Sequence, residues 1–156
     1  MKKLVAYFSA TGKTAAAAKN LAAAFGADIV EIKAAQPYSA ADLDYTNPKS
    51  RCSIEMGGDR SSRPEFEPVC CDVEAYDAID LVFPIWWGVA PTIVNSFLEK
   101  YDLAGKEITV YATSGISPLG DSAKCLEPSA PGATIKDGKM LNGNPSVDEI
   151  NAWINI

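Results

Sequence analysis

The sequence predicts an α/β fold in which helices flank both faces of a doubly wound parallel sheet of about five strands. Short apolar runs typical of strands alternate along the chain with helical patterns. Consecutive parallel strands need a long crossover, which is usually a helix, so this alternation indicates a parallel sheet. The 156 residues suit one domain with a substantial core, and we expect that domain to cover residues 1–156.

The first β-α-β unit is the clearest local pattern. Residues 3–8 form an almost continuous apolar run, which predicts a strand buried on both faces. Residues 13–25 are rich in alanine, the best helix former, and Gly26 follows as a stop signal. Residues 28–32 then predict a second strand, parallel to the first.

A long irregular segment, here called the excursion, covers residues 33–76. Prolines, a Gly-Gly pair and many polar residues interrupt any periodic pattern, and a short helix over residues 48–56 is the one element expected. Loops of this length usually have a function or contain short helices. Several of its side chains could cover a ligand, but we interpret them first as surface residues: Tyr38, Tyr45, Arg51 and Arg63.

Regular structure returns with residues 78–83, an apolar run that predicts the third strand. An amphipathic helix is predicted over residues 90–101, because apolar side chains recur there at the spacing of one helix face. Pro91 suits its first turn, where the missing N–H is not needed. Residues 107–112 predict the fourth strand.

The C-terminal part has weaker patterns. A helix is expected over residues 120–126, and residues 133–135 predict a short fifth strand. Asp137-Gly138 is a turn signal that would end this strand. Ser146 and Glu149 have the spacing of a capping box, which predicts a final helix to about residue 155.

Composition and charge exclude several classes of partner. The net charge of −6 disfavours nucleic acid and anionic membranes, and it would suit docking onto basic patches of other proteins. No apolar run is long enough to span a bilayer. The first residues do not form the pattern of a signal peptide, so we expect a cytoplasmic protein.

The chain has four cysteines and no histidine. The missing imidazole excludes Ser-His and Cys-His nucleophilic catalysis and any zinc site with histidine ligands. No C-x-x-C spacing is present, and we interpret the adjacent Cys70 and Cys71 as plain thiols rather than a redox pair. We therefore expect neither a metal site nor a catalytic side chain.

The turn after the first strand, residues 9–14, predicts a phosphate site. A helix that begins at Lys13 leaves unpaired N–H groups and a partial positive charge at its start. Ser9, Thr11 and Thr14 add hydroxyl groups, and Gly12 allows a ligand to approach the backbone closely. The turn has room for a single phosphate group, and we call it the phosphate turn.

Three better-known phosphate motifs do not fit. In a P-loop ending in Gly12-Lys13-Thr14, the first glycine would fall on Tyr7. No G-x-G-x-x-G follows the first strand, so a dinucleotide fingerprint is absent. A receiver domain needs a carboxylate at the end of the third strand, where this chain has Phe83-Pro84.

Two further segments are expected at the same edge of the sheet, because ligands of such folds bind beyond the carboxyl ends of the strands. Residues 84–88, the wall loop, contain two adjacent tryptophans, of which one could enter the core while the other faces a planar ligand. Both could instead be core residues or part of a partner interface. Residues 113–115 offer hydroxyl and N–H groups to the polar edge of a heterocycle, or form an ordinary loop.

The first strand followed by Ser9-x-Thr11-Gly12-x-Thr14 resembles the phosphate loop of flavodoxins. A bacterial flavodoxin-like subgroup is resembled by Pro84-Ile85-Trp86-Trp87-Gly88, by the helix after it, and by Asp102-Leu103-x-Gly105-Lys106 running into Thr113-Ser114-Gly115. The resemblance covers most of the chain and implies a flavodoxin-like sheet of order 2-1-3-4-5 with one non-covalent FMN. It implies phosphate binding by Ser9, Thr11, Gly12, Lys13 and Thr14. It implies contacts to the isoalloxazine ring by Pro84, Ile85, Trp86, Trp87, Gly88, Thr113, Ser114 and Gly115.

The resemblance implies an electron-transfer protein whose partners are FMN and redox proteins, and which is a monomer or a weak dimer. An alternative is an NAD(P)H-dependent FMN or quinone oxidoreductase on the same fold, which needs room for a nicotinamide or a quinone against the ring. A third interpretation is a binding module that no longer holds the cofactor. Because FMN performs the redox chemistry, none of these requires an acid or base side chain.

Overall fold

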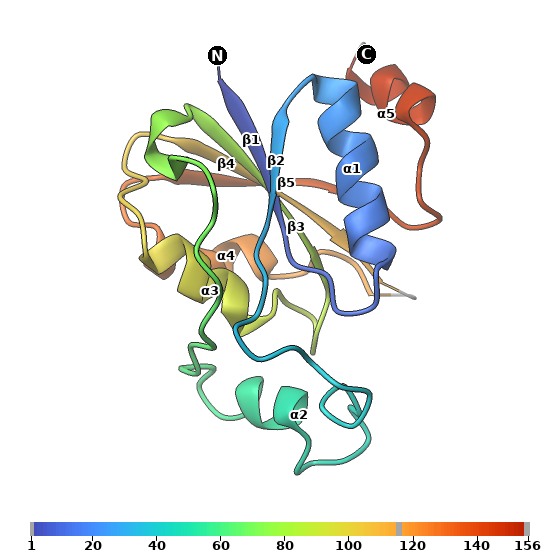
Figure 1. Cartoon of the computed structure of the whole chain (residues 1–156), viewed down its shortest axis with the longest axis vertical. Coiled ribbons are helices and arrows are strands. Elements are labelled where there is room, and N and C mark those ends of the chain that lie inside the picture. The colour runs from blue at the N-terminus through green and yellow to red at the C-terminus, as the bar shows by residue number, and fades with distance from the viewer. Residues whose placement is uncertain (1, 115–116, 155–156) are drawn as a thin grey trace.

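The computed structural model describes residues 2–114 and 117–154 and contains a five-stranded parallel sheet of order β2-β1-β3-β4-β5 (Figure 1). This order confirms the predicted fold class. The strands are β1 (Lys3–Tyr7), β2 (Asp28–Glu31), β3 (Ala78–Pro84), β4 (Glu107–Thr113) and β5 (Thr134–Met140). Their carboxyl ends lie at the lower edge of the sheet in Figure 1, below which the excursion extends.

Helices cover both faces of the sheet. On one face lie α1 (Lys13–Phe25) and α5 (Val147–Ile154), and on the other lie α3 (Thr92–Glu99) and α4 (Ser122–Leu126) (Figure 1). Each layer has its own apolar core: Leu21 and Val82 belong to the first, Phe97 and Leu81 to the second. Three short elements complete the described chain: α2 (Arg51–Glu55) and the 3₁₀ turns Val73–Ala75 and Glu127–Ser129.

The ends of the helices follow local signals. α1 has the predicted bounds, with Gly12 and Gly26 in left-handed conformations on either side. α3 begins two residues later than predicted, because Pro91 is extended (φ −59°, ψ 146°) and precedes the first helical residue. The capping box of α5 is confirmed: the Glu149 N–H donates to the Ser146 Oγ at 3.2 Å.

The predicted end of the fifth strand is wrong. β5 does not stop at residue 135, and Asp137-Gly138 is not a turn but part of the strand. Strand β5 pairs with β4 from Thr134 onward, with a register shift near Val110. A Cβ on Gly138 would lie 2.7 Å from the ring of Tyr111, so this glycine makes room for an aromatic side chain on the neighbouring strand.

The excursion is closed at its base by main-chain hydrogen bonds. Ala35 and Glu67 donate to Glu65 and Lys33 at 2.9 and 2.7 Å, beside an antiparallel bridge between Ala34 and Phe66. The predicted helix over residues 48–56 appears as the shorter α2, which lies beyond the carboxyl ends of the strands (Figure 1).

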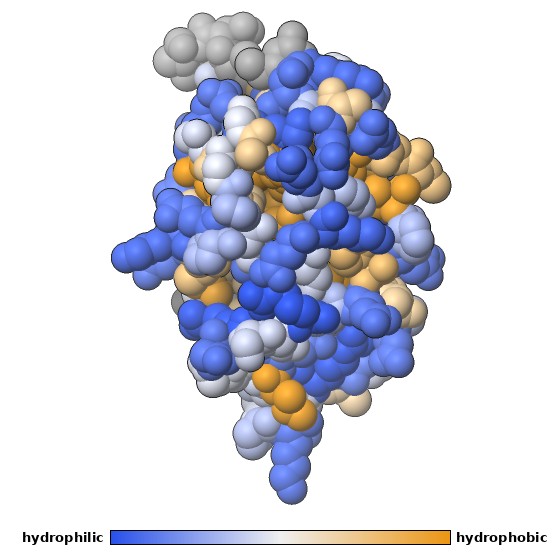
Figure 2. Space-filling view, turned by 90° about the vertical axis from the view of Figure 1, so that its left-hand side faces the viewer, coloured by the Kyte–Doolittle hydropathy of each residue, from blue (hydrophilic) through white to orange (hydrophobic). Residues whose placement is uncertain are grey.

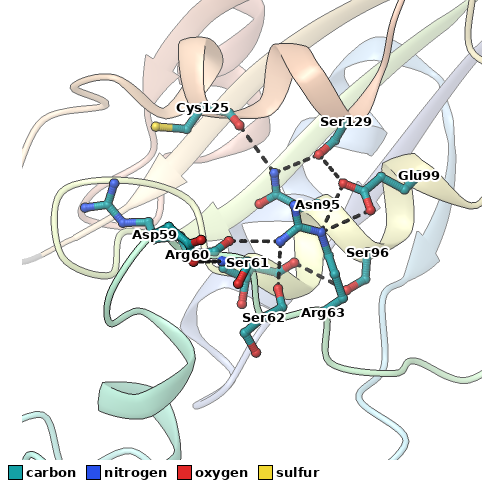
Figure 3. A network of polar contacts seen from close by, with 11 residues as sticks. Asp59, Arg60, Ser61, Ser62, Arg63, Asn95, Ser96, Glu99, Cys125 and Ser129 are labelled. Carbon is teal, nitrogen blue, oxygen red and sulfur yellow. Dashed lines mark hydrogen bonds and ion pairs between the residues drawn. The ribbon is translucent and has the colours of Figure 1, made fainter.

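A second contact holds the excursion against α3. The Arg63 Nε donates to both carboxylate oxygens of Glu99 at 3.0 Å, and Ser129 Oγ donates to the same carboxylate at 2.7 Å (Figure 3). Asn95 Nδ2 in turn donates to Ser129 Oγ at 2.9 Å and to the Cys125 carbonyl at 3.3 Å. The segment around Arg63 is therefore tied to α3 and, through Glu99, to the 3₁₀ turn Glu127–Ser129.

The outer surface is predominantly hydrophilic on the face shown in Figure 2, where apolar side chains form small separate patches. Within residues 2–114 and 117–154, no helix combines the length and apolar character needed to cross a membrane.

Candidate functional site

A cavity of about 1180 Å³ opens at the carboxyl ends of the strands, where ligands bind in folds of this type. Five separate segments line it: the phosphate turn, the wall loop, the end of β4, the loop between β5 and α5, and the excursion. The lining residues are Ala10, Thr11, Gly12, Lys13, Thr14, Ala16, Leu43, Tyr45, Cys52, Pro84, Ile85, Trp86, Trp87, Thr113, Ser114, Leu141, Asn142, Gly143 and Asn144.

The phosphate turn presents the start of α1 to this cavity. Gly12, with φ +94°, precedes the first helical residue, and no side chain caps the helix. The amides of the first helical turn have no partner inside a helix, so they are free to bind an anion. Ser9 Oγ accepts the Gly12 N–H at 3.0 Å, so Ser9 shapes the turn without itself lining the cavity.

The hydroxyl groups of Thr14 and Thr113 lie 2.8 Å apart and share a hydrogen bond. This bond joins the first turn of α1 to the end of β4. One of the two hydroxyl protons forms the shared bond, which leaves the other available to a ligand. Thr14 is almost completely buried, with 3% of its surface exposed, so its hydroxyl has a fixed position.

The wall loop turns sharply after β3. Trp86 and Val89 form an isolated antiparallel bridge, and the two residues between them, Trp87 and Gly88, have φ of +52° and +81°. Positive φ at both central residues is the requirement of a type I′ turn, and it is a strained conformation for tryptophan. The two indoles differ in burial: Trp86 packs against the core, whereas Trp87 is 44% exposed, and both line the cavity.

The side chains of the wall loop line the cavity, but its glycine does not. Pro84, Ile85, Trp86 and Trp87 line the cavity, and Gly88 does not. The Gly88 carbonyl oxygen would lie 2.8 Å from a Cβ on Gly120, so it faces the segment before α4.

The end of β4 contributes Thr113 and Ser114 to the cavity, while Gly115 lies outside the described residues. The Ser114 N–H donates to Asn142 Oδ1 at 2.7 Å. This bond holds the β4 end against the loop that follows β5, so the two loops form one continuous rim.

Two main groups of lining residues were not predicted from the sequence. Asn142, Gly143 and Asn144 follow β5, and they were overlooked because the strand was predicted to end before them. An Asn-Gly-Asn sequence beyond a longer fifth strand is the signal that could have found them. Leu43, Tyr45 and Cys52 come from the excursion, whose irregular pattern gave no indication of where it packs.

The charge of the cavity wall fits an anion at one end. Among the described residues that line the cavity, Lys13 alone carries a charge, and it lies at the start of α1. The lining also contains aromatic and apolar side chains, among them Trp86, Trp87 and Leu43. The donor set therefore suits a phosphate group attached to a flat, largely uncharged ring system.

Comparisons with known proteins identify the family of the chain. The profile of the flavodoxin family matches residues 2–156. Two solved structures, of candidate flavoproteins from Bacteroides eggerthii and Bacteroides uniformis, are each 44% identical to this chain, with TM-scores of 0.89 and 0.91. Both alignments cover 99% of this chain, and they cover 96% and 98% of the two relatives.

A flavoprotein from Lactobacillus acidophilus, solved in complex with FMN, is 20% identical with a TM-score of 0.70. The alignment covers 98% of each chain, and the likeness concerns the fold. No curated protein matches the sequence.

Proposed function

The chain belongs to the flavodoxin family, and we propose that it binds one FMN and transfers electrons between redox proteins. The observation that carries the proposal is the pairing, in one cavity, of an uncapped helix start with a wall of two tryptophans. A phosphate monoester suits the first, and a flat ring system suits the second.

The phosphate end would be held by the amides at the start of α1, by Lys13 and by the hydroxyls of Thr11 and Thr14. Thr113 keeps the Thr14 hydroxyl in place across the 2.8 Å bond. A single positive side chain and one helix start match the charge of a monophosphate better than that of a pyrophosphate, which spreads its charge over two groups.

The ring would lie against the wall loop and the rim formed by Ser114 and Asn142. When bound, FMN supplies the redox chemistry, and the protein supplies binding, orientation and polarity. Trp86 and Trp87 exclude water from the wall side of the ring. Electrons reach a partner through the open side of the cavity, and the net charge of −6 favours a partner with a basic surface.

The experiment compares FMN with riboflavin, which has the same ring and no phosphate. We expect FMN to bind at least about a hundredfold more tightly, because two to three charge-assisted hydrogen bonds are lost without the phosphate. The Thr11→Ala/Thr14→Ala variant should reduce this preference, while Thr134→Ala, at the opposite edge of the sheet, should not. Equal affinity for the two flavins would contradict the phosphate site.

Electron transfer is tested separately with the FMN-loaded protein. If the protein is a carrier, NAD(P)H is oxidised at an appreciable rate in the presence of a quinone only when a separate reductase is added, because the reductase passes the electrons to the carrier. Rapid consumption without the added reductase would instead support the alternative function, a direct NAD(P)H-dependent oxidoreductase. If the protein does not bind FMN at all, both the electron carrier and the oxidoreductase are contradicted, and a binding module without a cofactor is supported.

A further inference from the structure

Three aromatic rings from distant parts of the chain meet behind the wall loop. Phe8, Tyr38 and Trp86 pack edge to face in all three pairs, with ring centroids 5.5–5.6 Å apart and interplanar angles of 68–87°. Phe8 is fully buried at the end of β1, directly before the phosphate turn, and Trp86 lines the cavity. Tyr38 is the one member that comes from the excursion.

Tyr38 is held rigidly from its other side. Its hydroxyl donates to the Glu55 Oε1 at 2.5 Å, and the Arg51 guanidinium lies 3.8 Å from the centre of its ring. Arg51 is itself fixed, because its Nε donates to the Glu55 Oε2 at 2.9 Å and its Nη1 donates to the Gln36 carbonyl at 2.6 Å. Glu55 is buried, with 8% of its surface exposed.

This arrangement keeps the Tyr38 hydroxyl protonated. Burial raises the pKa of Tyr38 far above its usual value, and the hydrogen bond to Glu55 raises it further. The hydroxyl therefore remains a hydrogen-bond donor at neutral pH, and it keeps its bond to Glu55.

The Trp86 side chain depends on packing partners for its orientation, because its main chain makes few contacts. It stands at the start of a two-residue turn in which Trp87 and Gly88 have positive φ, and its main-chain contacts there are two hydrogen bonds with Val89. Tyr38 and Phe8 contact its ring edge to face, a geometry that stabilises an aromatic pair beyond the area that it buries. The orientation of the cavity wall thus depends on a residue of the excursion.

We propose that Tyr38, clamped by Glu55 and Arg51, is a positioning residue that fixes the Trp86 indole as the wall against which the flavin ring binds. The inference rests on the proposed function for the identity of the ring. The excursion then has a role beyond covering the surface. Its helix α2 carries Arg51 and Glu55, which hold Tyr38, and Tyr38 in turn orients the Trp86 indole.

The decisive test is a double-mutant cycle on FMN affinity with Tyr38→Met, Trp86→Leu and the double variant. Methionine fills much of the space without a rigid ring, so the variant is expected to fold. We expect Tyr38→Met to weaken FMN about tenfold, as one lost aromatic pair predicts, and to have little further effect when Trp86 is already absent. Riboflavin should weaken by the same factor as FMN, because the phosphate end is unchanged.

Two matched variants separate positioning from general stability. Tyr38→Phe loses the hydrogen bond to Glu55 but retains the ring and its contacts with Phe8, Trp86 and Arg51, so it should bind FMN within about threefold of the wild type. Arg63→Ala loosens the excursion at its other anchor, on Glu99, and should leave FMN affinity unchanged. An additive double-mutant cycle, or equal losses in the Tyr38→Met and Tyr38→Phe variants, would overturn the proposal.

A readout without FMN keeps this inference separate from the proposed function. The near-ultraviolet circular dichroism of the protein free of flavin reports on fixed aromatic side chains, and Trp86→Leu identifies the contribution of that indole. Tyr38→Met should remove the same band while the far-ultraviolet spectrum stays unchanged. If the band survives in Tyr38→Met, Tyr38 does not position Trp86, whether or not the protein binds FMN.

Discussion

Thr14 and Thr113 are 99 residues apart in sequence, yet their hydroxyl groups lie 2.8 Å from each other beside the cavity. Thr14 belongs to the first turn of α1 and Thr113 ends β4. The bond connects the helix start that would bind a phosphate with the strand end that flanks the ring. It therefore links the two halves of the site.

Thr113→Val removes the hydroxyl partner of Thr14 and preserves the shape of the side chain. We expect the affinity for FMN to fall about tenfold, because a freely rotating Thr14 hydroxyl no longer points to one position. Riboflavin affinity should change little. Thr109→Val, four residues earlier on β4 and outside the cavity lining, is the matched control, and both are measured by flavin fluorescence titration. A loss of riboflavin affinity as large as that of FMN would contradict this role.

Asp80 is a buried carboxyl group in the middle of β3, with 1% of its surface exposed. Burial raises its pKa to about 6, and this outweighs the opposing effects of Lys3, whose Nζ lies 3.6 Å from Oδ2, and of Lys136. The pKa in the unfolded chain is about 3.9, so the folded state binds the proton more tightly. This group's contribution to stability is complete below about pH 4 and is lost as the pH rises to about 6.

We therefore expect Asp80→Asn to gain stability relative to the wild type across that interval. The difference in the free energy of unfolding should grow by roughly 2–3 kcal/mol between pH 4 and pH 6.5 and stay constant above it. Urea denaturation at a series of pH values measures this difference. The exposed Asp137→Asn on β5 is the control and should show no such change. A difference that shrinks as the pH rises would refute the raised pKa.

Gly138 packs beneath the ring of Tyr111, and a Cβ there would lie 2.7–2.8 Å from two ring atoms and 2.8 Å from the Val110 carbonyl oxygen. Because a carbonyl in a strand cannot move aside, Gly138→Ala should lower the free energy of unfolding by about 2 kcal/mol or more. Lys136→Ala, exposed on the same strand, should change it by less than about 0.5 kcal/mol. Chemical denaturation of both variants measures these values; similar stabilities would contradict the packing argument.

The polar network around Glu99 predicts that substitutions within it lower the global stability by different amounts (Figure 3). Asn95 is buried and donates to Ser129 and to the Cys125 carbonyl, so Asn95→Ala should cost about 1–3 kcal/mol of global stability. The Arg63–Glu99 pair is partly exposed, so Arg63→Ala should cost less than about 1 kcal/mol globally. It should nevertheless speed proteolysis of residues 57–63, because an anchor of the excursion is lost. The reverse order of global stabilities would contradict this assignment.

Local sequence patterns predicted many of the helices and strands. The bounds of α1 follow from its alanines and from the two glycines that flank it, and the capping box of α5 needs only Ser146 and Glu149. The fifth strand could not be bounded in this way. Asp137-Gly138 favours a turn locally, but pairing with β4 and the ring of Tyr111 require an extended glycine at that point.

By itself, the sequence determined the parallel sheet, its edge and the segments that meet there, because each depends on residues close together in the chain. Only the tertiary structure decided that Tyr45 of the excursion lines the cavity and that Tyr38 packs on Trp86. It also decided that Asn142 holds Ser114 and that Thr14 meets Thr113. Ser114 and Asn142 are 28 positions apart in the sequence, and Thr14 and Thr113 are 99 positions apart. Tyr38 lies within the excursion, whereas Trp86 follows β3. Such contacts depend on three-dimensional packing, which the pattern of neighbouring residues in the sequence does not predict.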